Sequence, residues 1–136
     1  MIDTNIMCYM IEEDDRMTKD VSEIVNNCEN LLYISLETVK ELVVAYRRKN
    51  LFINRWKTAE ELVKAIKTYY NVTILNVDIN VIQKMAQLQI NEAEQHYDPS
   101  DHIIIAHAMT VGMTLISSDR KFPFYRAQGL DLVSNF

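Results

Sequence analysis

Short apolar runs alternate along the chain with longer segments in which apolar residues recur every three or four positions. The first pattern is typical of buried strands and the second of amphipathic helices. The patterns predict strands over 1–3, 31–34, 72–77, 114–117 and 130–133, helices over 18–28, 37–49, 56–70, 78–90 and 98–112, a turn or helix over 6–11, and a short helix that Asp119 opens and Pro123 breaks. Strands that alternate with helices indicate an α/β fold with a parallel sheet and helices on both of its faces.

Chain length and composition limit how many cores the chain can build. With 136 residues, of which 49% are hydrophobic, we expect a single domain over 1–136. No run approaches the about 18 apolar residues needed to cross a bilayer, and the first residues lack a basic leader, so we expect a cytoplasmic protein without a membrane segment. Cys8 and Cys28 lack metal-ligand spacing, and we interpret them as buried, reduced thiols.

Four of the 19 acidic residues stand where a predicted strand ends or a predicted helix begins. Asp3 and Asp119 follow strands, and parallel strands bring their carboxyl ends to the same edge of a sheet. Asp101 is expected in the first turn of a helix that Asp98 caps, where the helix dipole favours the ionised form. Glu41 lies on the inward side of its helix, where a carboxylate needs a partner. We therefore expect these four carboxylates to meet in one place.

Ordinary structural roles explain each of the four acids taken singly. A loop position, a helix cap or complementation of a helix dipole accounts for each aspartate, and Glu41 could form a surface pair with Lys40 or Arg48. Only the joint placement favours a shared site. Clustered carboxylates raise one another's pKa and stay ionised only with compensating cations. A ligand set made of oxygens suits Mg²⁺ or Mn²⁺ and disfavours zinc, so the sequence predicts a magnesium or manganese site at these acids.

The net charge of −5 argues against indiscriminate binding of nucleic acid, which depends on Lys and Arg. Any nucleic acid must therefore meet a local basic patch. The candidate cluster lies at the junction of two predicted helices and comprises Arg47, Arg48, Lys49, Arg55 and Lys57. A solvated helix end explains the same cluster, because cations in a last helical turn complement the dipole.

The three histidines test for a zinc site. His102 and His107 are five positions apart and do not share a helix face, and His96 falls in a predicted loop. We expect the histidines at the surface or at the rim of the site, where His96 and His102 could touch phosphate. Tyr97 and Tyr125, near the acidic motifs, are candidates for stacking against bases.

Five segments that span nearly the whole chain carry a family resemblance. They are DTN at 3–5, SLETVKEL at 35–42, DPSDHIIIAHA at 98–108, TLISSDRKF at 114–122 and FYRAQGLDLV at 124–133. In type and order they resemble the PIN-domain family of nucleases, and in particular the VapC-type toxins of bacterial toxin–antitoxin pairs. The family usually has several strand residues before its first Asp, whereas only Met1 and Ile2 precede Asp3 here. This difference implies a truncated start or an unusually short central strand.

The resemblance implies a three-layer α/β/α fold around a central parallel sheet of about five strands. It also implies an acidic pocket made by the same four acids that position alone selects. Asn5 and Ser117 match positions that help the family to hold metal or orient its ligands. Asp98 is similar to a frequent extra acid, and we interpret it as a helix cap first and a ligand second.

The function implied by the resemblance is a Mg²⁺- or Mn²⁺-dependent ribonuclease that hydrolyses RNA phosphodiester bonds and leaves 5′-phosphate and 3′-hydroxyl ends. It further implies a homodimer that is silenced by a small antitoxin protein, whose tail enters the pocket and can present an Arg to the acids. The alternative is a catalytically inactive PIN-like domain that acts as an RNA- or protein-binding module. The RNA target, the cleavage site, the number of metal ions and the carboxylate that acts as the base are left open by the sequence.

Overall fold

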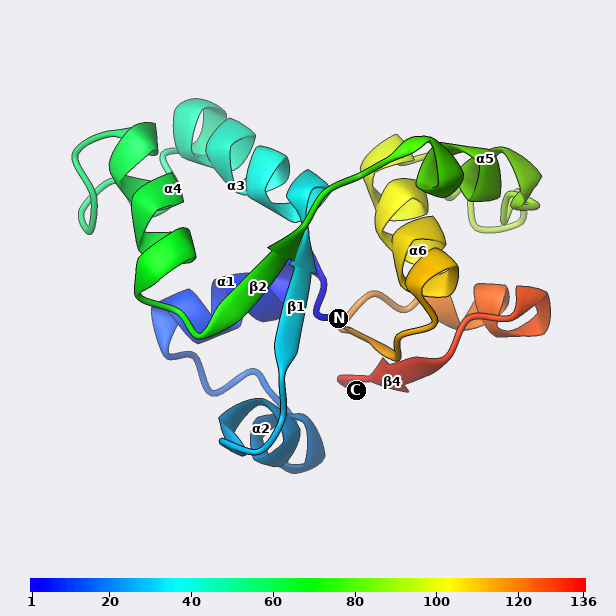
Figure 1. The fold of residues 1–136 in the computed structure, drawn as a ribbon, viewed down its shortest axis with the longest axis horizontal. Helices are drawn as coiled ribbons and strands as arrows, with labels where there is room; N and C mark the ends of the chain where they lie inside the picture. Colours follow the sequence, from blue (N-terminus) through cyan, green and yellow to red (C-terminus); the bar gives the residue numbers. More distant parts are fainter.

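The computed structural model describes residues 1–136 as helices packed around short parallel strands. The elements are α1 (Thr4–Glu12), α2 (Lys19–Asn26), β1 (Leu32–Ser35), α3 (Leu36–Lys49), α4 (Ala59–Thr68), β2 (Val72–Leu75), α5 (Ile79–Gln87), α6 (Pro99–Val111), β3 (Leu115–Ser117), the 3₁₀ helix η1 (Phe122–Gln128) and β4 (Leu132–Ser134). In Figure 1, α3 and α4 lie to one side of β1 and β2, and α5 and α6 lie to the other. Polar side chains accept hydrogen bonds from the first turns of all six α-helices, which fixes where these helices begin.

The parallel strands form two pairs, β1 with β2 and β3 with β4. The segment Met1–Asp3 lies between the pairs and is hydrogen-bonded to both. The Ile2 N–H donates to the Tyr33 carbonyl in β1 at 2.9 Å, and the Asp3 N–H donates to the Ile116 carbonyl in β3 at 3.0 Å. Ile2 and Ile116 also form a parallel bridge. The spatial order is therefore β2, β1, Met1–Asp3, β3, β4.

The predicted α/β class with parallel strands is confirmed, with one change in the sheet. Instead of a continuous sheet of about five strands, the structure has two small sheets joined through the single bridge at Ile2. Asp3 is still extended but already caps α1, so the chain turns into a helix at Thr4. A helix that starts this early leaves no residues for a longer central strand.

The predicted position of the short helix, which was expected to begin at Asp119, is wrong. Residues 118–119 are irregular, and the 3₁₀ helix begins only at Phe122, with Pro123 in its first turn. Proline is tolerated in a first turn because the N–H that it lacks would have no partner there. Pro123 therefore helps to begin η1 and does not break a helix.

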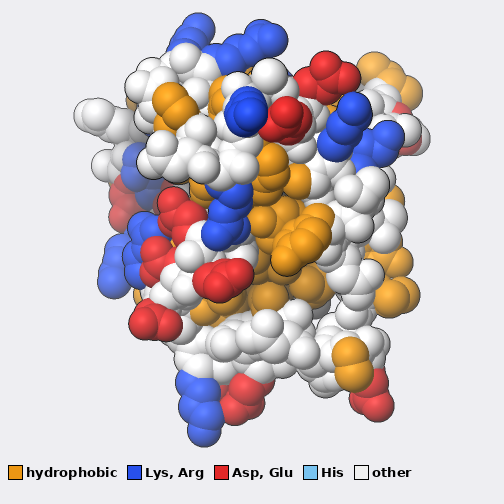
Figure 2. Space-filling model, turned by 90° about the vertical axis from the view of Figure 1, so that its left-hand side faces the viewer, with side chains coloured by type: hydrophobic (Ala, Val, Ile, Leu, Met, Phe, Trp, Pro, Cys, Tyr) orange, Lys and Arg blue, Asp and Glu red, His pale blue; other side chains and the backbone are white.

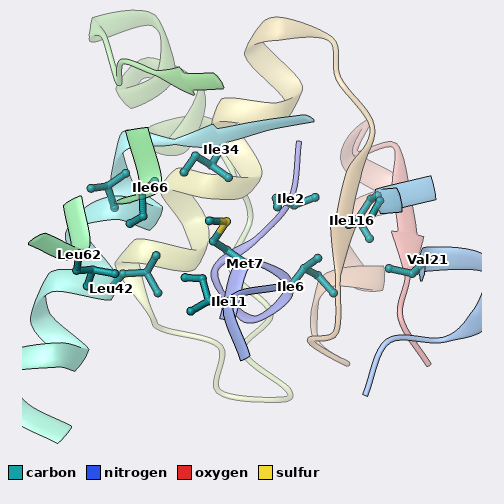
Figure 3. Packing of buried hydrophobic residues seen from close by; sticks show 12 residues of the cluster. Ile2, Ile6, Met7, Ile11, Val21, Ile34, Leu42, Leu62, Ile66 and Ile116 are labelled. Atoms are coloured by element: carbon teal, nitrogen blue, oxygen red, sulfur yellow. The ribbon is translucent and has the colours of Figure 1, made fainter. Parts of the chain in front are cut away.

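A cluster of 12 buried apolar residues joins the sheet to the helices. Figure 3 shows Ile6, Met7 and Ile11 of α1 close to Ile2 and Ile116 of the central bridge. Fully burying an aliphatic side chain of this size contributes about 1.5–3 kcal/mol, so the region around the bridge is strongly held. A second cluster packs α6 against η1 and the ends of the β3–β4 pair, and its largest side chains are Phe122 and Tyr125.

Two further expectations concern exposure. Cys8 is half-buried and Cys28 is exposed, so the expected burial is met only in part by Cys8 and is wrong for Cys28, while both cysteines are free thiols as expected. None of the helices combines the length and the apolar composition that crossing a membrane requires.

Candidate metal centre in an acidic cleft

A cleft of about 720 Å³ opens between α1, α3, the start of α6 and the loop after β3. The four carboxylates selected from the sequence all line it, namely Asp3, Glu41, Asp101 and Asp119. These residues come from four separate parts of the chain, and two of them, Asp3 and Asp119, stand within two residues of the end of an extended segment. The structure therefore brings the candidate site residues together at one edge, as the parallel topology requires.

Asp3 is the most deeply buried of the four acids, with 4% of its surface exposed. Its Oδ1 accepts a hydrogen bond from the Ile6 N–H at 2.8 Å, and its Oδ2 accepts one from the Ser117 hydroxyl. Burial raises the pKa of Asp3 from 3.8 to about 7, with smaller contributions from the charges of Asp101 and Asp119. The two hydrogen bonds oppose this rise because they favour the ionised form. At neutral pH, Asp3 therefore needs a proton or a cation beside it.

Glu41 lies one turn into α3 and accepts a hydrogen bond from the Thr4 hydroxyl. Burial raises the pKa of Glu41, the charges of Asp101 and other nearby acids add to the rise, and the Thr4 hydrogen bond opposes it. Glu41 forms no ion pair, since Lys40 is paired with Glu37 and Arg48 is within ion-pair distance of no carboxylate. The surface-pair alternative considered for Glu41 is thus wrong.

Asp101 is the third residue of α6, as predicted, and its Oδ2 lies 2.9 Å from the Nε2 of His96. Burial raises the pKa of Asp101, and the hydrogen bond with His96 opposes the rise. Asp119 follows β3, and its N–H donates to the Ser117 hydroxyl oxygen at 3.0 Å. Its own Oδ1 accepts from the Lys121 N–H at 2.7 Å. The Ser117 hydroxyl therefore connects Asp119 to Asp3.

The auxiliary residues divide according to their contacts. Ser117 binds Asp3 directly, whereas Asn5 is exposed on the wall of the cleft and makes no side-chain hydrogen bond. Asp98 accepts a hydrogen bond from the Ser100 N–H at 2.9 Å and caps α6, while its side chain also lines the cleft. Sequence reasoning missed Thr4, although a hydroxyl next to Asp3 at the start of a helix is a signal that it could have used.

Four cations line the same cleft, and they are Arg16, Lys40, Arg48 and Lys49. The predicted basic cluster is therefore divided, because Arg47, Arg55 and Lys57 do not line the cleft. Arg55 instead donates to the Ile11 carbonyl, and its guanidinium lies 5.9 Å from the centre of the Trp56 ring. The cleft consequently combines an acidic floor with a basic rim provided mainly by α3.

The expectation that the histidines lie at the surface or rim is wrong. His96, His102 and His107 are only 2%, 4% and 1% exposed. His96 and His102 both hydrogen-bond to the Tyr125 hydroxyl, and His107 hydrogen-bonds to the Ser35 hydroxyl at 2.9 Å. Tyr125 is fully buried as well, so it cannot stack against a base as predicted.

The donor set of the cleft fits a hard divalent cation. Asp3, Glu41 and Asp101 have raised pKa values, and none of them is paired with Lys or Arg. Close carboxylates without a cationic partner must take up protons or bind a cation. Carboxylate oxygens are the ligands that Mg²⁺ and Mn²⁺ prefer. The residues present thus suit a magnesium or manganese ion.

Comparison with known families matches residues 1–130 to the PIN domain, and the chain belongs to this family. PIN domains are typically nucleases, and they generally use a divalent metal. A comparison with curated protein sequences found no match.

Solved structures agree with this assignment at the level of the fold. A toxin–antitoxin complex from Klebsiella pneumoniae has 18% sequence identity and a TM-score of 0.64, and the match covers 99% of this chain and 96% of that one. VapBC2 from Rickettsia felis, bound to a DNA fragment from its promoter, has 20% identity and a TM-score of 0.69, with 98% and 96% covered. FitAcB from Neisseria gonorrhoeae has 19% identity and a TM-score of 0.70, with the same coverage. The whole chain therefore has the fold of these proteins.

Proposed function

We propose that this chain is a metal-dependent endoribonuclease and the toxin of a type II toxin–antitoxin pair. The observation that carries the proposal is the convergence in one cleft of four carboxylates, three of which have raised pKa values and no Lys or Arg partner. Membership of the PIN family supports a nuclease, and the Klebsiella and Rickettsia structures support a toxin–antitoxin context.

In this proposal, Asp3, Glu41 and Asp101 hold Mg²⁺ or Mn²⁺ directly or through water, and Asp119 completes the site. When bound, such an ion would neutralise charge on the scissile phosphate and lower the pKa of a bound water. The hydroxyls of Thr4 and Ser117 keep their carboxylates oriented toward the cleft. One of the four carboxylates accepts the proton of the attacking water.

The basic rim gives the RNA backbone a place to bind next to the acids. Lys40, Arg48 and Lys49 line the cleft from α3, and their charges favour phosphate binding by displacing counterions. Tyr97, which is 60% exposed and precedes α6, remains the candidate for stacking against a base. Hydrolysis at this site would leave a 5′-phosphate and a 3′-hydroxyl.

The proposed antitoxin would cover an apolar face beside the cleft. A second hollow of about 320 Å³ is lined by side chains that include Tyr9, Met10, Met17, Val25 and Tyr70. Figure 2, which views the molecule from the side of α4, shows apolar side chains gathered in the middle of this face between acidic and basic groups. An apolar segment of a partner could cover such a patch while an Arg of its tail pairs with the carboxylates of the cleft. A homodimer is also part of this proposal.

The test of the nuclease proposal is cleavage of a cellular RNA mixture with Mg²⁺ or Mn²⁺. The natural chain is compared with Asp3→Asn, with Asp101→Asn and with Asp20→Asn. The last variant removes the same charge from an exposed position in the first turn of α2 that lines neither hollow. We expect cutting by the natural chain and the Asp20 variant, and its loss in the two cleft variants, because each loses a metal-binding carboxylate.

Circular dichroism of each variant shows whether the fold is retained. Normal cutting by both cleft variants would exclude the four-carboxylate mechanism. Metal binding by the natural chain without any cleavage of RNA would favour the inactive binding module instead.

A further inference from the structure

A line of hydrogen bonds runs from the acidic cleft into the protein interior. It begins at Asp101, whose Oδ2 lies 2.9 Å from the Nε2 of His96. The Nδ1 of His96 lies 3.1 Å from the Tyr125 hydroxyl oxygen, which in turn lies 3.0 Å from the Nε2 of His102. Beyond Asp101 the line is shielded from water, because His96, Tyr125 and His102 are at most 4% exposed.

The donors in this line follow from the chemistry of its first member. An ionised carboxylate only accepts hydrogen bonds, so His96 must donate to Asp101 from Nε2. The Nδ1 of a neutral imidazole then accepts, and the Tyr125 hydroxyl donates its single proton there. The Tyr125 oxygen is left to accept from the Nε2–H of His102. Every donor in the line thus points toward Asp101.

Packing and the backbone hold the His96 ring in this position. The ring centre lies 5.0 Å from that of His102 and 5.8 Å from that of Phe122. The His96 N–H also donates to the Asn91 carbonyl at 3.0 Å, which closes the turn that leads into α6. Hydrogen bonds thus hold both ring nitrogens and the backbone N–H of His96, and His96 can support the Asp101 carboxylate in the first turn of α6 rigidly.

We infer that His96 is a positioning residue for Asp101. The Nε2–H of His96 holds Oδ2 of Asp101, so that Oδ1 of Asp101 is free to bind a divalent cation. The Oδ1 atom makes no hydrogen bond within the chain, and Asp101 lines the cleft. Partners that orient a metal-binding carboxylate in this way typically change metal affinity by about 10–100-fold when they are removed. This inference rests on the proposed function, because it concerns the metal site proposed above.

The geometry also suggests a competing role for His96, which the hydrogen bonds disfavour. His96, Asp101 and Asp119 place ligand atoms within 4.8 Å of one another, as a direct His–Asp–Asp metal site would. In the arrangement described, however, Nε2 carries a proton that is shared with Asp101, and Nδ1 faces Tyr125. Neither ring nitrogen then offers a lone pair to the cleft.

Three variants separate positioning from packing. His96→Leu replaces the ring with an apolar side chain and removes both ring nitrogens. His96→Gln places an amide N–H near the position of Nε2 and can still donate to Asp101. Tyr125→Phe removes only the hydroxyl that fixes the His96 ring.

The measurements are Mn²⁺ affinity by titration calorimetry, cleavage of RNA, and the unfolding midpoint of each chain in EDTA. We expect Mn²⁺ affinity to fall about 10–100-fold in His96→Leu, to recover in His96→Gln, and to fall less in Tyr125→Phe. The recovery in His96→Gln distinguishes positioning from a purely structural role, because packing of the aromatic ring is lost in both His96 variants. If the Leu and Gln variants lose affinity equally, or if both bind Mn²⁺ like the natural chain, the inference is wrong.

A measurement on the natural chain keeps the inference testable should His96→Leu not fold. In ¹⁵N-histidine NMR spectra, His96 is expected to be protonated at Nε2 and unprotonated at Nδ1, both before and after Mg²⁺ is added. Loss of the Nε2 proton on adding Mg²⁺ would make His96 a ligand and overturn positioning. If the natural chain binds neither Mg²⁺ nor Mn²⁺, the proposed function itself fails. If the natural chain and the His96 variants bind Mn²⁺ equally well, only the positioning role of His96 fails.

Discussion

The burial of Asp3 predicts that replacing it with Asn stabilises the metal-free protein at alkaline pH while it removes activity. The pKa of Asp3 is 3.8 in its ordinary state and about 7 in the folded chain. Between these pH values the folded chain binds the proton that the unfolded chain has released. Ionising Asp3 therefore lowers the free energy of unfolding as pH rises from 3.8 to about 7, and the full loss persists above that pH.

The size of this effect follows from the span of the shift. Each pH unit is worth about 1.4 kcal/mol, so an ionised Asp3 destabilises the metal-free chain by about 4 kcal/mol above pH 7. Asn has no charge, and its oxygen can still accept from the Ile6 N–H. Its amide group cannot accept from the Ser117 hydroxyl, which costs about 1–2 kcal/mol at every pH. The net gain of the variant is about 2–3 kcal/mol at pH 8.5 and close to zero near pH 5.

Urea unfolding in EDTA tests the prediction. The free energy of unfolding of the natural chain and of Asp3→Asn is compared at several pH values between about 5 and 8.5. The advantage of Asp3→Asn should grow by about 3 kcal/mol over this range. Addition of Mg²⁺ should stabilise the natural chain and leave the variant less affected, because a bound cation favours the folded state that holds it. An advantage that does not change with pH would refute the idea that burial of the Asp3 charge is the cause.

Three other variants probe the remaining parts of the structure. Ser117→Ala removes a hydrogen bond that lowers the pKa of Asp3, so it should move the pH dependence of RNA cleavage toward higher pH. An unchanged pH profile would contradict this role of the hydrogen bond. Replacing Arg48 and Lys49 with Gln should weaken RNA binding, measured by fluorescence anisotropy, and should reduce the slope of log affinity against log salt by about 1.4. Arg47 does not line the cleft, so Arg47→Gln should change neither the affinity nor the slope. Leu62→Ala, in the fully buried part of α4, should lower the free energy of unfolding by about 2–5 kcal/mol in denaturant titrations, and a loss below 1 kcal/mol would show that the core relaxes around the cavity.

Much of the fold could be predicted because its signals are local. Asp78 and Asp98 cap α5 and α6 as expected, and the apolar runs before Asp119 and after Asn71 mark strands within one or two residues. Position at strand ends also placed Asp3 and Asp119 at the same edge, because parallel topology leaves few other arrangements.

The features that sequence reasoning missed depend on contacts between distant residues. His96 lies in a loop with a polar sequence around it, and it is buried because His102 of α6 and the η1 residues Phe122 and Tyr125 pack around its ring. Arg55 follows Arg48 and Lys49 closely in sequence, yet it donates to a carbonyl of α1 and does not contribute to the basic rim of the cleft. The central strand was reduced to one bridge because Asp3 is needed as a helix cap immediately afterwards.

The bridge between Ile2 and Ile116 has a consequence for the order of events during synthesis. Asp3 is synthesised more than a hundred residues before Ile116, whose carbonyl accepts a hydrogen bond from the Asp3 N–H. Until then Asp3 has neither its β3 neighbour nor Asp119 beside it. If the chain is the ribonuclease proposed above, its complete carboxylate site can form only after the segment that contains β3 and Asp119 has been synthesised.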